Sequence, residues 1–163
     1  TGSSAPDRPV APPRPPARLC IGVTGHRETN PSFVANRERI ERAFAQVLDT
    51  ITRLLAEEAR DPGSPRLETP RMHSLLADGA DQIAAAATLA RDWELVAPLP
   101  FGLDLNIAIN AHPKSGSEAR ALLDGAGLEG CADAALRERA QRLRMLTSQA
   151  PSHSTKRRIR PTV

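Results

Sequence analysis

Two short turns carry the residue types best suited to hold an anion. The first is Thr24-Gly25-His26-Arg27, and the second is Asp78-Gly79-Ala80-Asp81. Glycine lets a main chain approach a ligand closely, and the planar guanidinium of an arginine can bind an oxyanion through two N–H groups. A helix beginning at the second turn would add unpaired N–H groups that also favour an anion. The two turns therefore predict a site for a phosphate-bearing molecule.

Each turn follows a short apolar run that predicts a β-strand. Strands are expected at Arg18–Val23 and Arg71–Leu76, and a third is expected at Glu94–Leu99. The intervening segments are long enough for crossovers between parallel strands. In a parallel sheet both turns fall at the carboxyl edge, where open α/β folds bind ligands.

The first expected strand is almost continuously apolar, which favours a central position, buried on both faces of the sheet. Cys20 within it is expected to act as a small core hydrophobe. The other cysteine, Cys131, is distant in sequence, so the chain shows neither a disulfide framework nor a metal-binding pattern.

Helical signals separate the expected strands. Asn30 before Pro31 is typical of a helix cap with proline at the first helical position. Apolar residues then recur at helical spacing from Ile40 to Leu55, until an Asp-Pro-Gly sequence ends the helix. An alanine-rich helix is expected at Asp81–Arg91, where small side chains allow close packing on the sheet.

The pattern after Phe101 fits either an edge strand or an irregular helix, because apolar residues alternate with polar or small ones. Two further helices are expected at Ser117–Leu123 and Ala132–Leu146. We expect a proline-rich, disordered arm at 1–17, one folded domain at 18–146 and a disordered basic tail at 147–163.

Composition fits a single globular domain. The 163 residues are 40% hydrophobic and 25% charged, and the formal net charge is +3. Basic residues gather near the end of the chain, so the remainder is close to neutral and argues against a nucleic-acid surface. No apolar run is long enough to span a membrane, and no secretory leader is evident. We therefore expect a cytoplasmic protein.

Three motifs in order resemble those of the SLOG superfamily. They read VTGHR from Val23, LLADGADQIAAAA from Leu75 and LVAPLPF from Leu95, and the resemblance spans about residues 18 to 125. This Rossmann-like group includes the LOG phosphoribohydrolases, the DNA-processing protein A family and many sensors of bacterial conflict systems. The resemblance implies a Rossmann-like three-layer α/β sandwich with a small parallel sheet.

The resemblance also implies a nucleotide or nucleotide-derived ligand over the strand ends. Gly25 would let the first turn approach this ligand, and Arg27 would face its phosphate or sugar. Gly79 and Asp81 would form the second wall. The residues expected at the ligand site are Thr24, Gly25, His26, Arg27, Asp78, Gly79, Ala80 and Asp81.

The chain departs from the SLOG pattern after the third strand. The family usually continues with a strand and a Gly-Gly-Thr loop that cradles phosphate, and no such loop follows here. We therefore expect an incomplete sheet, as in a truncated or frame-shifted member, and no catalytic residue, metal ligand or cofactor. An open sheet edge would favour a homo-oligomer.

These features favour binding or sensing of a nucleotide-derived ligand without catalysis. Two alternatives stay open: a LOG-type phosphoribohydrolase of nucleoside 5′-monophosphates, and a nucleic-acid-binding module like the DNA-processing relatives. Individual residues also have structural alternatives. Asp78 and Asp81 could cap a helix N-terminus, and the first turn could be a simple connection. His26 fits a turn residue better than a catalyst, and His73 and His112 stand alone.

Overall fold

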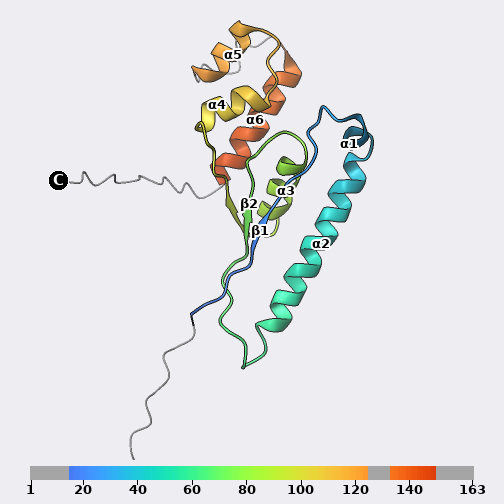
Figure 1. Ribbon diagram of the computed structural model, residues 1–163, viewed down its shortest axis with the longest axis vertical. Helices are drawn as coiled ribbons and strands as arrows, with labels where there is room; N and C mark the ends of the chain where they lie inside the picture. Colours follow the sequence, from blue (N-terminus) through green and yellow to red (C-terminus); the bar gives the residue numbers. More distant parts are fainter. Residues whose placement is uncertain (1–14, 125–132, 150–163) are drawn as a thin grey trace, which may run out of the picture.

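The computed structural model describes residues 15–124 and 133–149 (Figure 1). Three strands, β1 (Cys20–Gly22), β2 (Arg71–His73) and β3 (Glu94–Val96), form a parallel sheet in the spatial order β1-β2-β3. This arrangement confirms the mixed, Rossmann-like α/β class with a small, incomplete parallel sheet. Residues 1–14 of the expected arm, residues 150–163 of the expected tail and Cys131 lie outside the described residues.

The strand β1 lies at an edge of the sheet, so the prediction of a central strand buried on both faces is wrong. Both crossovers step in the same direction, which leaves β1 at the end of the row. Ile21 is half-buried, whereas Cys20 on the opposite face is exposed. The expectation that Cys20 belongs to the core is therefore also wrong.

The expected helix cap after the first turn is confirmed. The Asn30 side chain accepts a hydrogen bond from Phe33 N at 3.0 Å, and Pro31 begins α1 (Pro31–Ala35). The chain is interrupted at Asn36 and continues as α2 (Arg37–Glu58). Leu48 is the fully buried residue of this long helix, so much of its surface stays accessible.

The alanine-rich helix α3 (Ala80–Leu89) packs on β2, β3 and α2. Right-handed crossovers in the order β1-β2-β3 place α2 and α3 on the same face of the sheet. Met72 and Leu95 point to that face and are fully buried. The opposite face carries an ion pair between Arg71 and Glu94. The helices of the two crossovers therefore supply one helical layer.

Three further helices follow β3: α4 (Leu103–Asn110), α5 (Gly116–Leu123) and α6 (Ala134–Gln149). The segment after Phe101 is thus helical rather than an edge strand. The helix α6 runs three residues past Leu146, into the segment expected to be a disordered tail. Figure 1 shows α4, α5 and α6 grouped beyond the end of the strands where the chain leaves β1. There α4 packs on α5 and α6, and α6 packs on α3.

Candidate ligand site at the carboxyl edge of the sheet

The two predicted turns are in direct contact. Ala80 N donates a hydrogen bond to His26 O at 3.1 Å. A Cβ atom on Gly25 would lie 2.5 Å from Ala80 Cβ, and one on Gly79 would lie 2.3 Å from His26 O. The turns therefore meet, as a shared carboxyl edge requires, but the space over each glycine is filled by the other turn. Both glycines serve contact between the turns in this structure.

Asp78 fastens the second turn to the first. Its side chain is 2% exposed, and Oδ1 accepts a hydrogen bond from Arg27 Nη1 at 3.0 Å. Asp78 Oδ2 accepts a second from Glu28 N at 3.1 Å. The N-cap of α3 is Gly79, and no side chain caps it. Asp78 therefore links the two turns and does not cap α3, so the capping alternative is wrong for this residue.

Asp81 stands in the first turn of α3 and is buried. Burial raises the pKa of its carboxyl group, because the charged form loses its hydration. Hydrogen bonds from the backbones of Ala77 and Leu75 act in the opposite direction, as does the charge of Arg27. Burial is therefore the largest influence on the Asp81 carboxyl group.

A bend after His73 explains why β2 ends earlier than predicted. Ser74 Oγ accepts from Leu76 N at 3.1 Å and donates to Asp81 O at 3.1 Å. Leu76 is fully buried and has a φ of 56°, in the left-handed region that few leucines adopt. The bend directs the chain out of the sheet, before the turn that contains Asp78.

The helix α4 covers the second turn with two asparagines that the sequence analysis did not select. Asn110 Oδ1 accepts from Asp78 N at 3.3 Å and lies 3.4 Å from Arg27 Nη1. Asn106 Nδ2 donates to Leu75 O at 3.2 Å. Two asparagines four residues apart share one side of a helix. Their spacing in an otherwise apolar segment could have indicated a polar contact on one side of a helix.

His112 lies beside the same carboxylate, so the expectation that it stands alone is wrong. Its Nε2 atom is 3.0 Å from Asp78 Oδ2, without the alignment of a hydrogen bond. The side chain is 38% exposed and follows α4 directly. A histidine, an arginine and a buried carboxylate therefore meet at this edge of the sheet.

The two turns differ sharply in exposure. Thr24, Gly25, His26 and Arg27 are exposed, whereas Asp78, Gly79 and Asp81 are buried and Ala80 is half-buried. The Arg27 side chain is 50% exposed, and it contacts Asp78 and Asn110 through Nη1. Its Nε and Nη2 atoms have no protein partner within residues 15–124 and 133–149. The first turn can thus reach a ligand, while the second supports it from below.

Glu28 connects the first turn to two helices through basic side chains. Its carboxylate forms an ion pair with Arg37 of α2 and lies 3.6 Å from Arg142 Nη1 of α6. The exposed first turn is therefore held between α2 and α6, with arginines on both sides.

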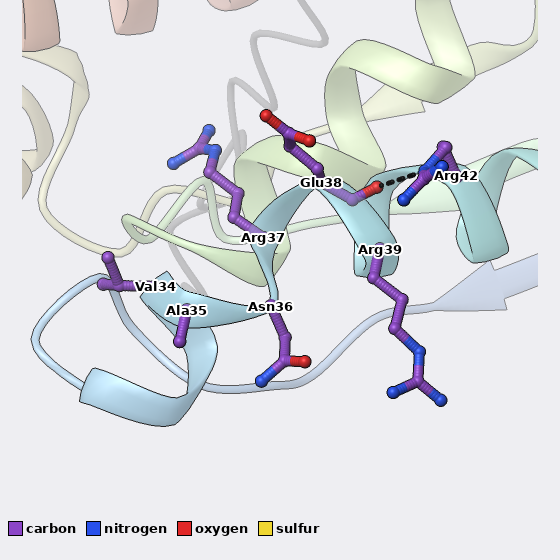
Figure 2. A pocket seen from close by; sticks show the side chains of 7 residues that line it. All are labelled: Val34, Ala35, Asn36, Arg37, Glu38, Arg39 and Arg42. Carbon is purple, nitrogen blue, oxygen red and sulfur yellow. Dashed lines mark hydrogen bonds between the residues drawn. The ribbon is translucent and has the colours of Figure 1, made fainter.

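A depression of about 490 Å³ lies at the junction of α1 and α2 (Figure 2). None of the eight predicted site residues lines it. Arg37 does, and its ion pair with Glu28 places the depression next to the first turn. Arg39 projects into solvent without a partner among the described residues. The lining residues are Val34, Ala35, Asn36, Arg37, Glu38, Arg39 and Arg42.

Comparisons with family models, curated proteins and solved structures returned no match to this chain. No helix in the described parts of the chain has the length and apolar character needed to cross a membrane. The same residues contain no group of three or more His, Cys, Asp or Glu side chains that could hold a metal ion.

Proposed function

We propose that this chain is a SLOG-like module that binds the phosphate of a nucleotide or nucleotide-derived ligand, without catalysing a reaction. The observation that carries this proposal is the state of Arg27. Its guanidinium is fixed through Nη1 by a buried carboxylate, and its two other nitrogens have no partner among the described residues. A planar guanidinium with free N–H groups is well suited to an oxyanion.

Asp78 is the residue that orients Arg27 in this proposal. A fixed side chain loses less conformational entropy on binding than a mobile one, so the ion pair between Asp78 and Arg27 favours affinity. His26 and Thr24 are exposed on the same turn and are available to the ligand as neighbours of Arg27. The residues of the second turn act through the first turn rather than by touching the ligand.

A depression large enough for a small molecule lies near the first turn. The depression of about 490 Å³ lies within the range of small-molecule sites, which is about 300–1,000 Å³. Arg37 lies at once in its lining and beside the first turn. A ligand with its phosphate on Arg27 would extend toward α2, where Glu28 and Glu41 already balance the charge of Arg37.

Calorimetry with AMP, GMP, ADP and ribose 5-phosphate tests the proposal, with adenosine as the ligand that lacks phosphate. Replacing Arg27 by alanine should weaken binding of a phosphate-bearing ligand at least about tenfold, or about 1.4 kcal/mol. Arg27→Lys should restore only part of the affinity, because an ammonium group lacks the guanidinium fork.

Arg53→Ala is the matched control. Arg53 is 61% exposed on α2 and, within the described part of the chain, pairs with Glu57 one helical turn further on. This variant should bind as the original chain does. Equal affinity of the Arg27→Ala variant and the original chain for every phosphate tested would disprove the role of Arg27. We also expect no release of free base from AMP.

A further inference from the structure

Within the described residues, no strand lies beside the outer edge of β1. Leu19 O and Val23 N bond to β2, at 2.9 Å to Arg71 N and 3.3 Å to His73 O. Alternate residues of a strand direct their N–H and C=O groups to opposite edges, so Cys20 and Gly22 direct theirs to the free edge. Unpaired edges of this kind are templates for another strand.

One side of α2 carries no charged residue between positions 40 and 54. Residues at alternating spacings of three and four, the spacing of a coiled-coil seam, are Ile40, Ala43, Val47, Thr50 and Leu54. Val47 and Leu54 are 54% and 51% exposed. The charged residues of α2 between positions 40 and 54 all lie outside this seam.

The seam faces away from α3, on the side of the free β1 edge. Arg91, directly after α3, binds Asp49 Oδ1 at 2.8 Å and Ala45 O at 2.9 Å. With 3.6 residues per turn, both positions stand about 160° from Val47 around the helix. Since α3 occupies one side of α2, the seam occupies the other. Figure 1 also shows α2 across the molecule from α4, α5 and α6.

We propose that a second copy of this chain covers the β1 edge and the α2 seam. A two-fold interface uses the same patch on both copies, so the patch must complement itself. The β1 edge does so as an antiparallel pair, and the α2 seam does so because it carries no charge that would repel its mate. Joining two copies this way forms a continuous six-stranded sheet with α2 packed against α2 of the partner.

The backbone also specifies a register for this pairing. With Cys20 opposite the partner's Cys20, Arg18 lies opposite the partner's Gly22. No atom of the described residues lies within 4 Å of the Cβ position of Gly22, so there is room for the arginine stem. Pro16 has no N–H group and ends the ladder on its side. The proposal does not rest on the proposed function.

Sedimentation equilibrium of the full chain, from low to high micromolar concentration, tests the assignment. We expect a species of twice the monomer mass. Val47→Arg should raise the dimer dissociation constant at least about tenfold, because it places two like charges in the seam. Met145→Arg is the control, since Met145 is 55% exposed on α6, outside the seam. Circular dichroism confirms that each variant is folded.

A short bis-maleimide cross-linker tests the register in a Cys131→Ser background. Cys20 should then link two chains, and Val47→Arg should reduce the linked product. A monomer at every concentration would overturn the proposal. A dimer that is unchanged by Val47→Arg and not linked through Cys20 would also overturn it.

Discussion

The two glycine turns follow neighbouring strands of one sheet, yet one is exposed and the other is buried. Arg27 in the first turn has a half-exposed side chain, whereas Asp78 in the second is 2% exposed. Two turns with matching positions in a sheet thus divide the work. Under the proposed function, the exposed turn offers groups to a ligand, and the buried turn holds those groups in place.

The cause of this difference is the placement of the later helices. The helix α4 contacts the second turn through Asn110 and Asn106, and α6 packs on α3 behind it. The first turn follows an edge strand and is left open except at Glu28. The cover over the carboxyl edge of the sheet is therefore uneven, and the uneven cover defines the candidate site.

The largest effect is expected at Gly79, in the buried turn. Gly79→Ala should destabilise the fold by about 4 kcal/mol, because the φ of 96° strains an alanine and its Cβ would lie 2.3 Å from His26 O. Gly102→Ala is the matched control, since its φ is 80° and no atom lies within 4 Å. It should cost only about 1–2 kcal/mol. Urea unfolding measures both, and equal costs would contradict the contact between the turns.

The next effect is expected at Asp78. Asp78→Asn should lower the free energy of unfolding by about 3 kcal/mol. It removes the buried charge that pairs with Arg27, and its amide NH₂ would face the N–H group of Arg27 or of Glu28. Asp124→Asn at an exposed position should change the stability by less than about 0.5 kcal/mol. If Asp78→Asn lowers the free energy of unfolding as little as the control does, the contacts of Asp78 with the first turn contribute little to stability.

Much of the fold followed from local sequence signals. Asn30 before Pro31 marked a helix start because the cap is made within four residues. The alanine-rich stretch predicted α3 because its composition alone favours a helix. The meeting of the two turns followed from parallel strands alone, since both strands end at one edge. These features depend on near neighbours or on one topological rule.

Other features depend on contacts that are distant in sequence. The edge position of β1 depends on which strands pair with it. The apolar sequence of β1 does not predict how many strands do so. The bend at Leu76 depends on Ser74 and Asp81 across the turn. The cover of the second turn depends on α4, whose alternating pattern fitted a strand equally well. The meeting of the two turns was therefore predicted, but the burial of the second turn was not foreseen.

A smaller loss of stability is expected at Arg27, in the exposed turn. Arg27→Ala should lower the free energy of unfolding by about 1 kcal/mol. The Arg27 side chain is half-exposed, and Asp78 still accepts the hydrogen bond from Glu28 N in this variant. The same change should have the largest effect on phosphate binding. Urea unfolding and calorimetry on one preparation separate the two roles. A loss of stability as large as that of Asp78→Asn would mean that both turns are structural.

The smallest effect is expected at Asp81 and depends on pH. The folded state raises the pKa of Asp81 above its ordinary value of 3.8, so the folded chain keeps this proton to higher pH than the unfolded chain. Stability from this group is therefore full at low pH and falls as pH rises through the window between the two pKa values. Asp81→Asn cannot titrate, so its stability relative to the original chain should rise across that window and then level off. Urea midpoints from about pH 3.5 to pH 7 measure the difference. A difference that grows as pH falls would mean that the backbone hydrogen bonds outweigh burial, and that Asp81 acts as a second charged clasp.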